Sequence, residues 1–367
     1  MGEKAPENPA QVAASGKTGS IQPVLWPMER RGSPTQSSLS TFMDRFLHTL
    51  LTIGLGLGCG FLIGTLFRRY GKDPRFLSRW RTRVQKFCLL VINPIAFVGA
   101  VWVLPVGNQA LTLLPLIGLT IVSSGFFVGW LAMRWRPLPT PGQGIGFSIS
   151  CSFTNMGNIG GLVVFLLLGE LAYSLVPFYK LFEEFWYYGV LFPYARQQAS
   201  AAGLYEDRSR QQHTLLRTVR DPFFLIVALA ISFGLTLNLM GVVRPPAYGV
   251  INSWLIPSSS FLLLSSVGSQ IRLGRIPRYW KPATAIVLLR LLVIPACTIG
   301  VALLLGLGQG DPLLIKTVLV LVMMPIGFTC LVPANLYNLD SDLVNTAWII
   351  STATLLVTVP LLSVLLA

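Results

Sequence analysis

Long apolar runs recur through almost the whole chain after residue 45, and they restrict its fold more than any other feature. A helix needs about 20 predominantly apolar residues to cross the hydrocarbon core of a bilayer, and most of these runs are that long. Only 11% of the residues are charged and the mean hydropathy is +0.65, whereas a soluble domain has roughly twice that charged fraction. The sequence therefore predicts an all-α polytopic membrane protein.

The apolar runs predict ten membrane-spanning segments, numbered one to ten along the chain. They are 46–67, 84–104, 110–133, 143–169, 171–195, 222–242, 247–271, 282–306, 312–338 and 342–366. Residues 1–45, rich in Ser, Pro, Gly and Gln, predict a disordered tail. Residues 196–221 predict a basic cytoplasmic loop between two five-helix repeats, 46–195 and 222–367.

Lys and Arg are distributed unevenly over the connections between segments. The connections after segments one, three, five and seven hold nearly all of them, and those after segments two, four, six and eight hold only Arg244. The positive-inside rule places the first set in the cytoplasm, so both termini are expected on the non-cytoplasmic side of the plasma (inner) membrane. The same rule accounts for the net charge of +14, so no nucleic-acid partner is expected.

Five spans per half is an odd number, so the two halves must cross the membrane in opposite directions. Inverted-repeat transporters are built this way, and they bind substrate near the midplane in broken helices. Segments four and nine hold the same place in their halves, and both are unsuited to an unbroken helix. Segment four contains FSISCSFTNMGNIGG, and segment nine contains MMPIGFTCLVPANLYNLD, in which Pro325 and Pro333 each lack a backbone donor.

The predicted substrate site lies where these two segments are interrupted. Asn155 and Asn158 offer amide groups to a carboxylate or an ion, and Gly157 lies between them. In segment nine, Pro325 and Pro333 are expected to force the interruption, with a true break favoured over a simple proline kink at Pro333. Asn335 is the expected counterpart of Asn158. The alternative is that the two asparagines only cap half-helices and touch no substrate.

Charged residues also lie inside the predicted spans, where a charge is costly. In segment five, Lys180 with Glu183 and Glu184 predicts either an internal ion pair or a carboxylate that titrates and couples proton movement to transport. In segment eight, Arg290 either extends toward the cytoplasm, pairs with a segment-five carboxylate or meets an anionic substrate.

The sequence gives no support for an enzyme. Its two histidines, His48 and His213, and five singly placed cysteines form no metal-ligand or nucleophile–base pattern, so no cofactor is expected. A Walker motif is also missing, which favours a proton gradient, a sodium gradient or the membrane potential as the energy source.

Several short motifs resemble the auxin efflux carrier family, whose architecture is shared with bile acid–sodium symporters. They are GNIGG at 157–161, SSVGSQIR at the end of segment seven, RLLVIP at 290–295, MPIGFTCLVPANLYNLDSD in segment nine, and Ser351-Thr352. The resemblance implies a secondary transporter (permease) of ten helices with segments four and nine crossing at the centre. It also implies a scaffold of segments one, two, six and seven and a moving domain formed by the others.

The resemblance further implies a small organic anion, often a carboxylate, that is moved by alternating access. The long cytoplasmic loop of the plant hormone carriers is absent from this sequence. Auxin itself is therefore not predicted to be the substrate. A sodium-coupled bile-acid-type symporter and a non-transporting sensor or scaffold are the alternatives. The partners are then the anion, H+ or Na+ as coupling ion, the lipid bilayer and, in one arrangement, a second copy in a homodimer.

Overall fold

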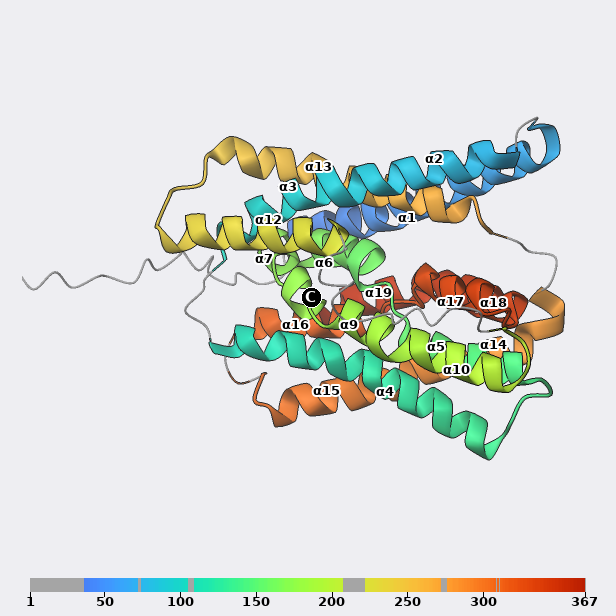
Figure 1. Ribbon diagram of the computed structural model, residues 1–367. Coiled ribbons are helices and arrows are strands. Elements are labelled where there is room, and N and C mark those ends of the chain that lie inside the picture. Colours follow the sequence, from blue (N-terminus) through green and yellow to red (C-terminus); the bar gives the residue numbers. More distant parts are fainter. Residues whose placement is uncertain are drawn as a thin grey trace, which may run out of the picture. The chain divides into compact units, whose positions relative to one another are not determined.

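The computed structural model describes residues 36–71, 74–104, 109–206, 222–271, 276–307, 309 and 311–366, and within these ranges it contains helices and no strands. The chain divides into two units, Met1–Thr41 and Phe42–Ala367. Of the first unit only residues 36–41 are described, and they are helical. All the contacts discussed below lie within the second unit, whose helices are labelled in Figure 1.

Seven helical stretches in the described residues are long and apolar enough to cross a membrane. They are Leu51–Tyr70, Arg79–Val101, Leu111–Trp135, Pro141–Leu168, Pro246–Gly268, Ile276–Leu304 and Ser341–Leu366. They coincide with segments one to four, seven, eight and ten, which confirms an integral, multi-pass membrane protein. Two shorter apolar helices, Leu225–Leu239 and Pro312–Val322, lie in segments six and nine.

Segment five differs from the prediction of one spanning helix. It is divided into α7 (Glu170–Tyr173), α8 (Val176–Tyr179), α9 (Glu183–Trp186), the π-helical turn η5 (Tyr187–Leu191) and α10 (Phe192–Ala201). Its sequence explains the division, because Pro177 lacks a backbone donor and the charged residues after it interrupt the apolar pattern.

Two predicted boundaries also change. Helix α1 (Gln36–Tyr70) begins ten residues before segment one, inside the predicted disordered tail. Helix α10 continues through Ala201 into the predicted polar loop. The rest of the predicted tail, residues 1–35, and residues 207–221 of the loop lie outside the described residues.

Three π-helical turns share one sequence feature, a proline that follows shortly afterwards. These turns are η2 (Cys88–Ile92), η5 and η6 (Leu289–Val293), and the following helices α3 (Asn93–Val101), α10 and α15 (Ile294–Leu304) each carry proline at the second position. Proline removes a backbone donor and its ring clashes with the preceding turn. A widened turn accommodates both effects, so these spans continue through their prolines.

The helices of segments one, two, six and seven pack against one another. Helix α3 packs against α12 (Pro222–Leu239) and α13 (Pro246–Gly268), and α13 also packs against α2 (Pro74–Phe87), as Figure 1 shows. A second set packs around α4 (Leu114–Trp135), α5 (Pro141–Ser152), α14 (Ile276–Leu288), α15 and α18 (Ser341–Ala353). The first set contains the helices that the resemblance assigns to the scaffold.

Close backbone contact joins α1 to α13. A β-carbon on Gly60 would overlap the carbonyl oxygen of Ser265, and one on Gly64 would overlap that of Ser269. From the other helix, a β-carbon on Gly268 would overlap the carbonyl oxygen of Leu57. Small residues let helices approach this closely in a membrane, where apolar side chains gain little from leaving lipid.

We expect Gly60→Ala to destabilise the protein by about 1–3 kcal/mol, because the added methyl group pushes α1 away from α13. Gly58→Ala is the matched control, since a β-carbon at Gly58 meets nothing within 4 Å. Thermal unfolding of the purified variants in detergent measures the difference. Equal unfolding midpoints for the two variants would show that the close approach does not matter for stability.

Candidate functional site

Segments four and nine are both interrupted, as predicted. In segment four, α5 ends at Ser152, residues 153–155 are not helical, and the π-helical turn η4 (Met156–Gly160) leads into α6 (Gly161–Leu168). In segment nine, α16 (Pro312–Val322) is followed by non-helical residues 323–327, then η7 (Phe328–Cys330) and α17 (Leu331–Leu336). We call residues 153–155 and 323–327 together the crossing.

Backbone hydrogen bonds join the two interruptions directly. The Asn155 N–H donates to the Pro325 carbonyl oxygen at 2.9 Å, and the Gly327 N–H donates to the Phe153 carbonyl oxygen at 3.4 Å. A β-carbon on Gly327 would lie 2.7 Å from the Thr154 carbonyl oxygen. Segments from opposite halves of the sequence therefore meet backbone to backbone at their interruptions.

Side chains from segments five and ten bind two further backbone N–H groups of the crossing. The Thr154 N–H donates to the Tyr187 hydroxyl oxygen at 3.1 Å, and the Ile326 N–H donates to Ser351 Oγ at 3.2 Å. Both bonds are buried. Non-helical backbone persists at membrane depth only where such partners replace water.

A chain of polar contacts runs from the crossing into segment five. Besides accepting from Thr154, the Tyr187 hydroxyl donates to Glu183 Oε1 at 2.8 Å. Glu183 Oε2 forms an ion pair with Lys180 Nζ at 3.1 Å. Lys180 in turn approaches segment four, because a β-carbon on Gly157 would lie 2.7 Å from Lys180 Nζ. The predicted pairing of Lys180 with Glu183 is present, and Glu184 is half-buried beside it.

Arg290 lies in η6, near the middle of its spanning stretch, and its side chain is fully buried. Its Nη2 donates to Thr154 Oγ1, while its Nε and Nη1 have no hydrogen-bond partner. The alternative that Arg290 extends toward the cytoplasm is therefore wrong, because a fully buried side chain does not reach water. No ion pair joins Arg290 to Glu183 among the described residues.

The two asparagines of segment four have different surroundings. Asn155 caps η4, since its Oδ1 accepts from the Ile159 N–H at 3.2 Å. Asn158 is half-buried, and its side-chain amide has no hydrogen-bond partner among the described residues. Its carbonyl oxygen accepts a long bond, 3.5 Å, from Ser260 Oγ of α13. The capping alternative thus accounts for Asn155, and Asn158 keeps an amide available to a ligand.

The prediction of an interruption at Pro333 is wrong. Pro333 lies in the first turn of α17, where backbone N–H groups have no intrahelical partner and proline is tolerated. The interruption occurs earlier, around Pro325. Asn335 is exposed near the end of α17, and its Oδ1 accepts from Ser341 Oγ at 2.8 Å. Asn335 is therefore not the spatial counterpart of Asn158.

Two residues of the crossing network, Thr154 and Tyr187, were not predicted as site residues. The spacing of Glu183 and Tyr187 by four positions indicates that their side chains can meet on one helical face. Only the tertiary structure brings Tyr187 to the backbone of Thr154.

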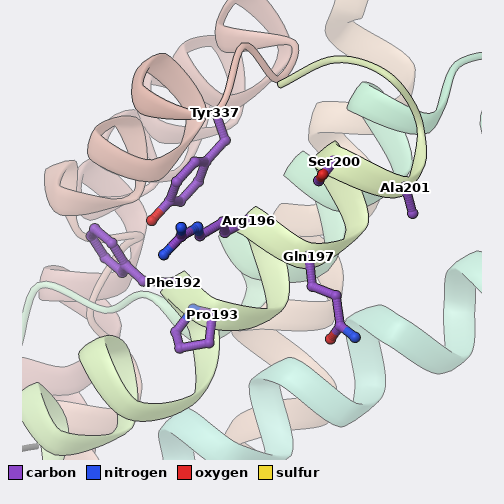
Figure 2. A pocket seen from close by; sticks show the side chains of 7 residues that line it. All are labelled: Phe192, Pro193, Arg196, Gln197, Ser200, Ala201 and Tyr337. Carbon is purple, nitrogen blue, oxygen red and sulfur yellow. The ribbon is translucent and has the colours of Figure 1, made fainter. Parts of the chain in front are cut away.

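A separate cavity of about 640 Å³ lies beside α10 and Tyr337, which follows α17. Figure 2 shows the Arg196 side chain extending between Phe192 and Tyr337, with Gln197 directed away. None of the crossing residues lines this cavity.

Comparison with known proteins identifies one family. Residues 256–363 match the family described as "Membrane transport protein", and this match supports the resemblance to the auxin efflux carrier family. The matched part includes Arg290 and Pro325, whereas Asn158 and Lys180 precede it. No curated protein matches the chain.

We expect Gly327→Ala to destabilise the protein by about 1–3 kcal/mol, because its methyl group would separate the two interruptions. Gly327 has φ −71° and ψ 135°, which alanine adopts without strain, so the expected effect comes from contact alone. Gly144→Ala is the control, since a β-carbon there meets nothing within 4 Å. Thermal unfolding in detergent compares them, and an unchanged midpoint for Gly327→Ala would contradict the close contact.

Proposed function

We propose that this chain, whose residues 256–363 belong to the membrane transport protein family, is a secondary transporter that moves a small organic anion by alternating access. The observation that carries the proposal is the pair of interrupted segments bonded to each other by their backbones. Broken helices that meet inside the bundle are where transporters of inverted-repeat design bind substrate. The match of residues 256–363 to a family of membrane transport proteins also supports transport over catalysis.

Charge at the crossing supports an anion as substrate. Arg290 contacts Thr154 inside the crossing, and Lys180 lies against Gly157 just after it. Both are cations, and the free amide of Asn158 adds donors that suit a carboxylate. A gradient or the membrane potential supplies the energy.

The proposed architecture has ten spans in two inverted repeats, with the termini on the non-cytoplasmic side. It is supported by the matching positions of the two interruptions and by the packing of segments one, two, six and seven into one set. In alternating access the other helices, including segments four and nine, move against this scaffold.

An ion pair ties the start of segment five, which directly follows the predicted outer end of segment four, to the proposed scaffold. Glu170, the first residue of α7, accepts from both terminal nitrogens of Arg244, at 2.5 and 3.1 Å. Asn252 Nδ2 of α13 also donates to Glu170, at 2.6 Å, and Arg244 donates to the Gly99 carbonyl oxygen of α3 at 2.8 Å. We propose that this Glu170–Arg244 pair holds the outer side closed.

The function is tested by counterflow of radiolabelled benzoate, phenylacetate, succinate and citrate in proteoliposomes. We expect exchange of at least one carboxylate, and we expect Asn158→Ala to lower its kcat/KM about tenfold or more, as loss of a hydrogen bond to a charged group does. Asn335→Ala is the control, because Asn335 lies away from the crossing. Absence of exchange of every carboxylate would refute the proposal.

Replacing sodium with choline in the same assay distinguishes a sodium-coupled symporter from a transporter that does not need sodium. Exchange that continues unchanged eliminates it, and exchange that stops favours a bile-acid-type symporter. A sensor or scaffold without transport would show no exchange in either buffer.

We expect Glu170→Gln to shift the protein toward an outward-open conformation. Without the carboxylate, Arg244 loses a bidentate partner of the strong, charge-assisted kind. In a variant whose native cysteines are replaced, Ser260→Cys should then react about tenfold faster with an impermeant maleimide added outside. The control is Lys316→Gln, because the Lys316 ammonium donates to the Leu366 carbonyl oxygen, away from the Glu170–Arg244 pair. An unchanged labelling rate would contradict a gating role for the pair.

A further inference from the structure

We infer that Lys180 is the residue that binds the carboxylate of the substrate, and that Glu183 occupies Lys180 as an internal competitor while the site is empty. This inference rests on the proposed function and specifies how the same site recognises its substrate class. It is carried by the position of Lys180, by the different exposure of the two partners and by the anchoring of Glu183.

Lys180 reaches η4, the turn that follows the crossing in segment four, because residue 157 is glycine. Its ammonium lies so close to Gly157 that a β-carbon there would be 2.7 Å from Nζ. Any other residue at this position would push the ammonium away. The next residue is Asn158, whose side-chain amide has no partner among the described residues. A cation and an amide without a partner among the described residues therefore lie on the same turn, η4, at the start of the second half of segment four.

The two partners of the ion pair differ in exposure. The Lys180 side chain is 30% exposed, whereas the Glu183 side chain is 4% exposed. An ammonium has three donors, and Glu183 occupies one side of it. The side of the ammonium that Glu183 leaves open can therefore take a second carboxylate.

Glu183 is fixed in place from its other side. Its Oε1 accepts from the Tyr187 hydroxyl, which is itself held by the Thr154 N–H. Glu183 therefore stays where it is when a second carboxylate arrives, and the two carboxylates share Lys180. Competition from Glu183 makes the site weaker for its substrate, which suits a transporter that must release what it binds.

Arg290 explains why the site tolerates a second carboxylate. It is fully buried, and two of its guanidinium nitrogens have no hydrogen-bond partner. Two cations, Lys180 and Arg290, thus act on the fully buried carboxylate of Glu183, with Glu184 half-buried nearby. The second positive charge offsets part of the repulsion between Glu183 and an arriving carboxylate.

A purely structural ion pair makes a different prediction from a competitive one. If the pair only stabilises segment five, removing either charge leaves a buried, unpaired partner, and both variants lose function in the same direction. If Glu183 competes with the substrate, the two variants change the apparent affinity in opposite directions. The sign of the change therefore separates the two cases.

The experiment uses the carboxylate with the fastest wild-type counterflow in proteoliposomes, chosen from benzoate, phenylacetate, succinate and citrate. We expect Lys180→Gln to raise its KM at least about tenfold. We expect Glu183→Gln to lower KM severalfold, because glutamine still accepts the Tyr187 hydrogen bond but no longer competes for Lys180. Lys180→Arg retains the charge and should restore much of the affinity.

Gly157→Ala tests the close approach of the Lys180 ammonium to residue 157, and it should raise KM, as Lys180→Gln does. Lys316→Gln is the matched control for loss of a lysine from another span, and it should leave KM unchanged. Each variant is first checked for a cooperative unfolding transition. If Lys180→Gln alone does not fold, the Lys180→Gln, Glu183→Gln double variant removes both charges together and should also raise KM.

The outcomes separate the inference from the proposed function. No counterflow of any carboxylate by the wild type refutes the proposed function. Wild-type counterflow with unchanged KM in Lys180→Gln, or with KM raised in both single variants, overturns the inference and leaves the function standing. Opposite changes in the two variants support it.

Discussion

The structure depends on one constraint, which is that backbone donors and acceptors buried in a membrane must find partners within the protein. Segments four and nine leave the helical conformation in the middle of their spans, where no water can replace the lost bonds. They satisfy part of the need with each other, through Asn155 with Pro325 and Gly327 with Phe153. Tyr187 and Ser351 supply further partners. The interruptions are thus stable only as a pair, with the neighbouring segments in place.

Glycine allows close contact in two places, at the crossing with its neighbouring lysine and between α1 and α13. Gly327 lets segment nine lie against the Thr154 carbonyl oxygen, and Gly157 lets the Lys180 ammonium lie against segment four. In the first set of helices, Gly60 and Gly64 let α1 touch the backbone of α13. An added β-carbon at any of these positions would overlap a neighbouring atom, so the helix or the ammonium beside it would have to shift. Packed helices do not absorb such a shift without loss of contacts.

The sequence was sufficient to predict the helical class, seven of the spans and the interruption of segments four and nine. The length of an apolar run, and residues that disfavour a helix, such as proline without its backbone N–H, can be read from the sequence locally. The position of the second interruption was not predictable in this way. Pro325 and Pro333 are equally unable to donate, and only their place relative to the start of α17 decides which one interrupts the segment. Tyr187 was missed for a related reason, since its role depends on a tertiary contact with Thr154. Segment five was predicted as one helix because its apolar content hides the effect of Pro177 and the charges.

The two described carboxylate–cation pairs have different consequences for motion because of where their members lie. Lys180 and Glu183 are three residues apart in one segment, so any rigid movement of that segment carries both and preserves their ion pair. Glu170 begins α7, whereas Arg244 lies in the connection from α12 to α13, so the two residues come from different halves of the sequence. A movement of α7 away from α12 and α13 would separate them. A pair that persists through motion therefore lies beside the proposed substrate site, and a pair that such a movement would break lies at the start of segment five. This is the division of roles that the proposed alternating access requires.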